Sequence, residues 1–130
     1  MITAIKELIE ESINRSVPGI LNFTYDEIIN LIEEHIVDII ENENIDIEII
    51  GIELHGSRLR GTYRENSDLD AVVEYRGNFK EDSLFNILNE DPLFIESIQV
   101  DINPIRKEET GTLKDYMIKS KQYDKTILEK

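Results

Sequence analysis

The stretch HGSRLRGTYRENSDLD, residues 55–70, carries a glycine–serine pair near one end and two aspartates, one residue apart, at the other. The residues before it, 45–54, are rich in β-branched side chains and predict a strand. A second strand is predicted over residues 69–75, where apolar residues dominate and acidic ones interrupt them. A polar connection between two strands can be a simple solvated loop, so the spacing of its residues has to decide whether it carries chemistry.

The aspartate pair belongs to the start of the second predicted strand. Asp68 and Asp70 are two residues apart, and this spacing directs both carboxylates to the same face of a sheet. A third strand is predicted over residues 95–102, with Asp101 on the face opposite its apolar neighbours. If the third strand lies next to the second, three carboxylates converge on one open face of the sheet.

Converging carboxylates predict a bound cation. Two carboxylates about 4 Å apart repel by roughly 4 kcal/mol at an effective dielectric constant near 20. Three such groups therefore need a cation, or one of them must take a proton. Oxygen ligands in a chain without cysteine favour Mg²⁺ or Mn²⁺, which also bind substrate phosphates. The residues thus predict a metal site, formed by Asp68, Asp70 and Asp101, that also holds a nucleoside triphosphate.

The other end of the stretch predicts phosphate binding. Gly56 and Ser57 follow the first strand directly and are expected to open a short helix, whose backbone amides would favour an anion. Arg58 and Arg60 can add positive charge beside the phosphates, or pair instead with nearby glutamates. Four of the six arginines of the chain lie in this stretch or shortly after it: Arg58, Arg60, Arg64 and Arg76.

Composition and charge narrow the class of partner. The 28 acidic and 14 basic residues give a net charge of −14, so extended nucleic-acid binding is unfavourable and a small anionic ligand suits the local arginines better. The sequence shows no run of 18 apolar residues that would span a membrane and no basic-then-apolar leader. The absence of cysteine fits a reducing compartment. We expect a cytoplasmic protein.

The order of predicted elements is two helices, strand, strand, helix, strand, helix. We expect one domain over residues 1–130, with a helical N-terminal part (1–41), a motif region (45–103) and a C-terminal helix at about 112–128. The expected fold class is α/β of the α+β kind, with a small mixed sheet of three to four strands and helices mainly on one face.

Local patterns set several boundaries of these elements. Thr24 and Glu27 predict a capping box at the start of the second helix, after an entry turn at residues 22–23. A phase shift in the apolar pattern predicts a bulge or a late strand start near Ile50. Thr112 is expected to cap the final helix.

The segment HGSRLRGTYRENSDLDAVVEY resembles the signature of the DNA polymerase beta-like nucleotidyltransferase superfamily. That signature is a Gly-Ser pair, a ten-residue spacer and Asp-x-Asp, and Arg60, Gly61, Ser67 and Leu69 also stand in typical places. The resemblance covers residues from about 45 to 103. The length of the chain and its RG-T-x4-SDLD pattern are similar to those of the small single-domain members called minimal nucleotidyltransferases.

The resemblance implies both the site and the reaction. Gly56 and Ser57 would contact the nucleotide phosphates, and Asp68 and Asp70 would ligate two divalent ions. Asp101 matches the third carboxylate of the family, which helps to activate the attacking hydroxyl. The implied reaction moves a nucleoside monophosphate from a triphosphate, with ATP as the expected donor, to a hydroxyl and releases pyrophosphate.

The sequence departs from the larger members of the superfamily, which carry a further helical domain that encloses the base. Fewer than 30 residues follow Asp101, so the base pocket must come from the final helix, from another subunit of a homo-oligomer or from a partner protein. Small members often act as antitoxins that nucleotidylate a separately encoded helical toxin. An antitoxin or a nucleotide-binding module that acts by binding a helical partner is therefore the alternative function. On the final helix, Lys114 and Tyr116 are expected to lie on a solvated face.

Overall fold

The structure is a computed structural model and describes residues 16–55 and 68–119. The elements, in chain order, are β1 (Ser16–Val17), β2 (Ile20–Thr24), α2 (Tyr25–Asn42), β3 (Glu48–His55), β4 (Leu69–Arg76), α4 (Glu81–Glu90), β5 (Leu93–Ile95) and β6 (Ile98–Ile105). A further helical segment, residues 113–119, follows β6 and is called the C-terminal helix below. The helix predicted near residues 3–15 lies outside the described residues.

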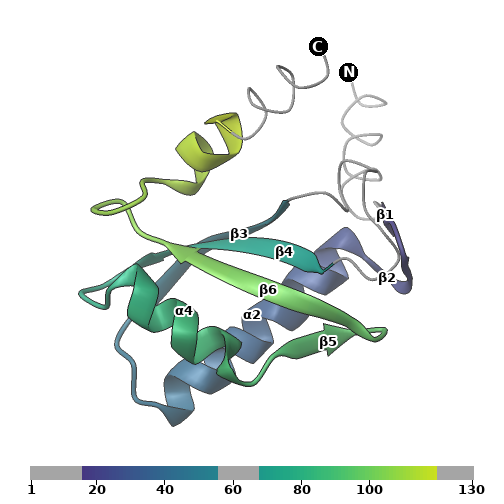
Figure 1. The fold of residues 1–130 in the computed structure, drawn as a ribbon, viewed down its shortest axis with the longest axis horizontal. Coiled ribbons are helices and arrows are strands. Elements are labelled where there is room, and N and C mark those ends of the chain that lie inside the picture. The colour runs from purple at the N-terminus through teal and green to yellow at the C-terminus, as the bar shows by residue number, and fades with distance from the viewer. Residues whose placement is uncertain (1–15, 56–67, 120–130) are drawn as a thin grey trace, which may run out of the picture.

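A mixed four-stranded sheet forms the centre of the molecule (Figure 1). Its strand order is β3-β4-β6-β5, with β4 and β6 parallel and the two outer pairs antiparallel. The chain leaves β4, passes through α4 and the short β5, and returns in β6 beside β4. The expected fold class is confirmed, and the sheet has the larger of the two expected strand numbers.

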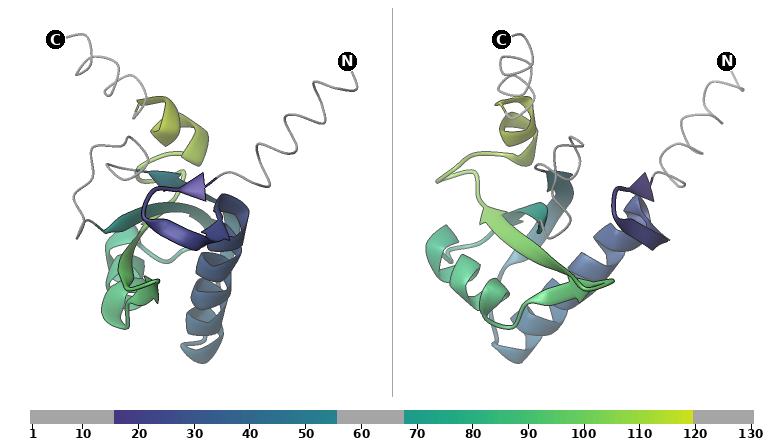
Figure 2. Two further views of the ribbon diagram at one scale, coloured as in Figure 1. Left: turned by 90° about the vertical axis from the view of Figure 1, so that its right-hand side faces the viewer. Right: turned by 45° about the vertical axis from the view of Figure 1, so that its right-hand side comes forward.

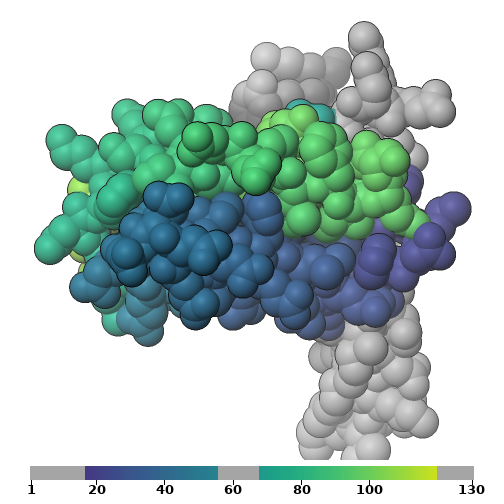
Figure 3. Space-filling view, turned by 90° about the horizontal axis from the view of Figure 1, so that it is seen from below, coloured from purple at the N-terminus to yellow at the C-terminus, as the bar shows by residue number. Residues whose placement is uncertain are grey.

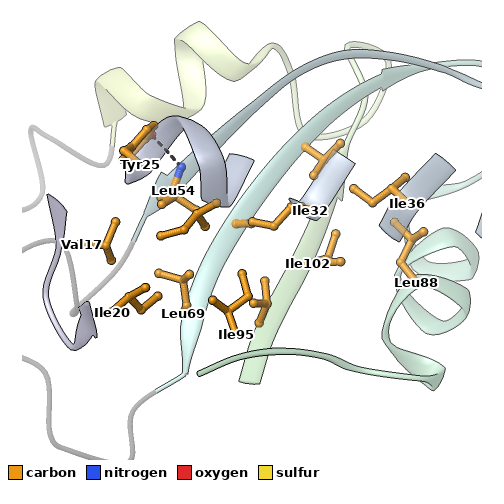
Figure 4. Packing of buried hydrophobic residues seen from close by; sticks show 14 of the residues in the cluster. Val17, Ile20, Tyr25, Ile32, Ile36, Leu54, Leu69, Leu88, Ile95 and Ile102 are labelled. Atoms are coloured by element: carbon orange, nitrogen blue, oxygen red, sulfur yellow. Dashed lines mark hydrogen bonds between the residues drawn. The ribbon is translucent and has the colours of Figure 1, made fainter. Parts of the chain in front are cut away.

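The helices α2 and α4 cover the same face of this sheet, and the C-terminal helix lies on the opposite side (Figures 1 and 2). Seen from the covered side, α2 and α4 lie next to each other and form much of the molecular surface (Figure 3). Between these helices and the sheet, the core packs apolar side chains from α2, the strands and the β1–β2 hairpin (Figure 4). One face of the sheet therefore provides the core, which leaves the other for chemistry.

The start of α2 is fixed by the predicted capping box. The Thr24 hydroxyl accepts a hydrogen bond from the Glu27 amide at 3.3 Å, and the Glu27 carboxylate accepts one from the Thr24 amide at 2.9 Å. The next residue, Tyr25, donates its hydroxyl to Glu53 at 2.6 Å and accepts from the Leu54 amide at 3.0 Å. The two bonds of Tyr25 tie the beginning of α2 to the last residues of β3, directly before the stretch at 55–70.

Two hairpins differ from the sequence-based expectation. The predicted entry turn at residues 22–23 is part of β2, and the Glu96 carboxylate accepts hydrogen bonds from the Leu21 and Asn22 amides at 2.7 and 3.1 Å. The strand predicted over residues 95–102 is instead two strands, β5 and β6. The turn between them places Glu96 and Ser97 at positive φ, 49° and 70°, without the glycine that usually marks such a turn.

The first strand of the sheet behaves as the pattern at Ile50 predicts. β3 begins at Glu48, later than residue 45, and its register with β4 shifts between Ile49 and Gly51. The shift leaves Ile50 at the bulge with 43% of its surface exposed. After the bulge the pairing is regular up to His55, so the end of β3 has a fixed register against the start of β4.

Candidate active site

The site lies where the start of β4 meets its two neighbouring strands. Asp70 of β4 is the register partner of His55 at the end of β3 and of Asp101 in β6. His55, Asp70 and Asp101 therefore form one row across three adjacent strands. Asp68 lies immediately before β4 and is exposed.

Alternation along the strands places these carboxylates away from the core. In β4 the flanking Leu69 and Ala71 are fully buried, whereas Asp70 is half-buried on the other face. In β6 Val100 and Ile102 are buried on the core side, and Asp101 is half-buried opposite them. The predicted sidedness of both strands is confirmed, and the parallel β4–β6 pairing brings the two aspartates side by side.

The electrostatics of Asp101 report the proximity of all three carboxylates. Burial raises the pKa of Asp101, and the charge of Asp68, a side-chain hydrogen bond with Asp68 and the charge of Asp70 raise it further. The Gln99 amide group opposes this rise in the pKa by donating a hydrogen bond to Asp101 at 3.3 Å. A hydrogen bond between two carboxyl groups requires a proton on one of them. The cluster is therefore one that a proton or a cation stabilises.

A bound metal ion requires several ligand side chains grouped closely around it. Across residues 16–55 and 68–119, no three histidine, aspartate or glutamate side chains are grouped closely enough to hold a metal ion as they stand. Charge coupling acts over longer distances than the metal–oxygen bonds of about 2.0–2.1 Å that Mg²⁺ forms. The three carboxylates have the chemistry of a hard-cation site, and they would have to come closer together to share an ion.

The residues predicted to bind phosphate lie outside the described part of the chain; they are Gly56, Ser57, Arg58 and Arg60. Arg76 is described, and it forms an exposed ion pair with Glu48 at 3.4 Å. It stands at the far end of β4, six residues or about 20 Å from Asp70. Arg76 therefore does not belong to the positive charge around the carboxylates.

Comparison with known families identifies the fold. The family model of the nucleotidyltransferase domain matches residues 33–124, which is well over half of the chain. The chain belongs to the nucleotidyltransferase domain family. Members of this family transfer nucleotidyl groups, and this nucleotidyltransferase domain is an enzyme of that general kind. No curated protein and no solved structure gives a significant match.

The family match reaches beyond the segment of 45–103 in which the resemblance is specific. It begins within α2 and continues past the C-terminal helix, so both belong to the nucleotidyltransferase domain. None of its helices within the described ranges has the length and hydrophobicity needed to cross a membrane.

The C-terminal helix brings Tyr116 to the edge of this candidate site. The Thr112 hydroxyl caps the helix by accepting from the Asp115 amide at 3.2 Å, as predicted. Glu74 of β4 accepts a hydrogen bond from the Leu113 amide at 2.8 Å. The Tyr116 ring packs against the His55 ring with centroids 5.3 Å apart, so Tyr116 is only partly solvated, whereas Lys114 is exposed as expected. No local pattern indicates this contact between residues so distant in sequence.

Proposed function

We propose that this protein is a divalent-metal-dependent nucleotidyltransferase that moves a nucleoside monophosphate from a nucleoside triphosphate, with ATP as the preferred donor, to a hydroxyl acceptor and releases pyrophosphate. One observation carries the proposal: Asp70 and Asp101 are register partners on parallel strands, with Asp68 electrostatically coupled to them. The family match supplies the general reaction.

Asp68 and Asp70, with Asp101 beside them, would hold one or two Mg²⁺ or Mn²⁺ ions. An ion bound there would stabilise negative charge on the attacking and leaving oxygens of an in-line displacement. The carboxylates supply only oxygen ligands, which suits these hard cations. Burial is the largest cause of the raised pKa of Asp101, and a bound cation would offset the repulsion that Asp68 and Asp70 add to it.

Asp101 has a second role in this proposal, as the acceptor of a proton. Its carboxylate oxygen takes the proton of the attacking hydroxyl as the bond between that oxygen and the α-phosphorus forms. The bond from the α-phosphorus to the bridging oxygen of the β-phosphate breaks at the same time, and pyrophosphate leaves. The half-buried position of Asp101 and its hydrogen bond from Gln99 would hold the accepting oxygen in place.

Gly56, Ser57, Arg58 and Arg60 are proposed to hold the triphosphate. They follow His55 directly in the chain, and His55 is fixed beside Asp70 by the β3–β4 pairing. Phosphates bound by these residues would therefore begin next to the carboxylates. Backbone amides and guanidinium groups are the donors that phosphate oxygens favour.

A transfer assay tests the proposed reaction. The full chain is incubated with Mg²⁺, each of the four α-labelled ribonucleoside triphosphates and a panel of protein, nucleic-acid and small-molecule acceptors, and pyrophosphate release and label transfer are measured. Transfer should fall by at least about 100-fold in Asp70→Asn. Glu90→Gln, which removes one exposed charge on α4, is the matched control and should leave transfer unchanged. Label transfer that Asp68→Asn and Asp70→Asn leave intact would contradict the proposed site.

A role through contact alone is the second candidate. Its support is the outer face of α2, where Glu33, Glu34 and Asp38 line a groove and the last turn holds no basic residue. Such a face suits a partner with a basic surface, such as a helical toxin that this protein neutralises. Neutralisation of a copurified partner that persists in Asp70→Asn would favour contact, whereas loss in that variant would favour nucleotidylation of the partner.

A further inference from the structure

The face of the sheet that carries the carboxylates is partly covered. Val72 lies between the core-facing Ala71 and Val73, so its side chain points to this opposite face, yet only 1% of its surface is exposed. The C-terminal helix is the described element that lies on this side of the sheet (Figures 1 and 2). Its first residue approaches β3 closely, because a Cβ built at Gly51 would be 3.2 Å from the Leu113 side chain.

The beginning of the C-terminal helix is fixed to the sheet at a defined place. Glu74 accepts a hydrogen bond from the Leu113 amide, and Glu74 lies on the same face of β4 as Asp70, four residues further along. The helix then makes one turn, with the Tyr116 amide donating to the Thr112 carbonyl at 3.0 Å. That turn brings Tyr116 to the row of residues that contains Asp70.

Tyr116 meets this row at His55. The two rings pack edge to face, with an interplanar angle of 76° and centroids 5.3 Å apart, and Tyr116 stays partly exposed. His55 is the register partner of Asp70 and also the residue before the proposed phosphate-binding pair. An aromatic surface therefore lies on the β3 side of Asp70, whereas Asp101 lies on the β6 side of Asp70.

We propose that Tyr116, supported by His55, is the surface on which the base of the nucleotide packs. The inference rests on the proposed function, in which Asp101 receives the proton of the acceptor. The acceptor then occupies the β6 side of the α-phosphate, which leaves the nucleoside the β3 side, where the aromatic pair stands. Every nucleobase has a π-face that stacks on tyrosine, so this surface contributes affinity for the nucleoside without reading hydrogen bonds.

Calorimetric titration of the full chain in Mg²⁺ separates base contacts from phosphate contacts. The probes are the four ribonucleoside triphosphates and inorganic tripolyphosphate, which has phosphates and no base. We expect the wild-type protein to bind its preferred nucleotide more tightly than tripolyphosphate. Tyr116→Ala should weaken that nucleotide about 10-fold and leave tripolyphosphate unchanged. Tyr116→Phe should retain nucleotide affinity, because it keeps the ring.

Ile118→Ala is the matched control, since it removes an exposed apolar side chain from the same helix and should change neither affinity. If Tyr116→Ala fails to fold, Tyr116→Leu, which keeps apolar bulk without the ring, is expected to show the same selective loss. Equal weakening of nucleotide and tripolyphosphate, or no weakening of either, would overturn the role of Tyr116. Equal wild-type affinity for both probes would overturn it while leaving the proposed function standing. Absence of any binding by the wild-type protein would overturn the proposed function as well.

Discussion

The ionised carboxylate of Asp101 serves the proposed reaction, yet the same charge lowers the stability of the folded protein. Its pKa in the folded protein lies above the unfolded value because of burial and then the neighbouring Asp68 and Asp70. The native state therefore binds more protons than the unfolded chain. The resulting stability is present below the unfolded pKa and is lost as the pH rises through the folded pKa.

We therefore expect Asp101→Asn, measured without divalent ions at neutral pH, to melt at a slightly higher temperature than the wild-type protein. The same substitution should lower nucleotidyl transfer by about 100-fold or more, because it removes the proposed proton acceptor. Thermal melts at pH 4 and pH 7.5, with Glu34→Gln as the matched single-charge control, would check the stability part. An Asp101→Asn variant that melts lower than wild type at pH 7.5 would contradict it.

Tyr75, on the core side of β4, is a second residue whose pKa is shifted by its environment. Burial raises the pKa of Tyr75 to about 12, and its hydroxyl donates to the Phe79 carbonyl. Ultraviolet titration of the folded protein should show a tyrosine that ionises only near pH 12. Since the unfolded value is near 10, stability from this group should fall as the pH rises from 10 toward 12.

Tyr75→Phe is the variant that assigns this titration to Tyr75. It should remove the late-titrating phenol and lower the free energy of unfolding by about 1 kcal/mol, because the Phe79 carbonyl loses its donor. Five tyrosines that titrate together near pH 10 in the folded wild-type protein would argue against the buried phenol.

At the scale of elements, the turn after β4 is tightly packed against the chain before β3. Gly77 has a φ of +152°, and a Cβ there would lie 2.9 Å from the Ile47 side chain and 3.0 Å from the Asp46 carbonyl oxygen. Gly77→Ala should therefore lower the free energy of unfolding by about 1–3 kcal/mol. Gly111, at φ +120° with nothing within 4 Å, is the matched control for backbone strain alone.

Denaturant melts of Gly77→Ala and Gly111→Ala would compare the two effects. The alanine at 77 should destabilise more, because it adds a steric clash to the unfavourable φ. Equal losses would mean that the chain around Asp46 and Ile47 moves freely to accommodate the methyl group.

Elements that show a local sequence pattern, such as alternating apolar residues or a capping box, were predictable. Features that depend on tertiary contacts were not. Alternation along β4 gives the strand and the sidedness of Asp70, and the capping box gives the start of α2. The strand β5 was missed because its three residues are followed by a turn of Glu96 and Ser97, which adopt positive φ without glycine. The contact of His55 with Tyr116 was missed because it depends on how the C-terminal helix docks on the sheet.

The whole molecule carries a net charge of −14, so its folded state contains considerable self-repulsion. Added salt should raise the melting temperature by screening. Mg²⁺ at matched ionic strength should raise it further, because an ion that binds only the native state stabilises that state. The gain is about 2.7 kcal/mol at a free ion concentration 100 times the dissociation constant.

Asp70→Asn tests whether that further gain belongs to the proposed site. The variant should keep the response to NaCl and lose most of the additional response to Mg²⁺, whereas Glu34→Gln should keep both. Scanning calorimetry at constant ionic strength measures the two responses separately. An additional Mg²⁺ response that survives in Asp70→Asn would place the ion elsewhere.

The alternation of β4 also has a consequence for how such a protein can evolve. Leu69, Ala71, Val73 and Tyr75 face the core, and the residues between them face the site. A substitution at Asp70 or Glu74 can therefore change what the protein recognises without opening a cavity beneath it. Descendants of one ancestral sheet can diversify their substrates while inheriting the same core, because selection for recognition and selection for packing act on alternate codons of one short gene segment.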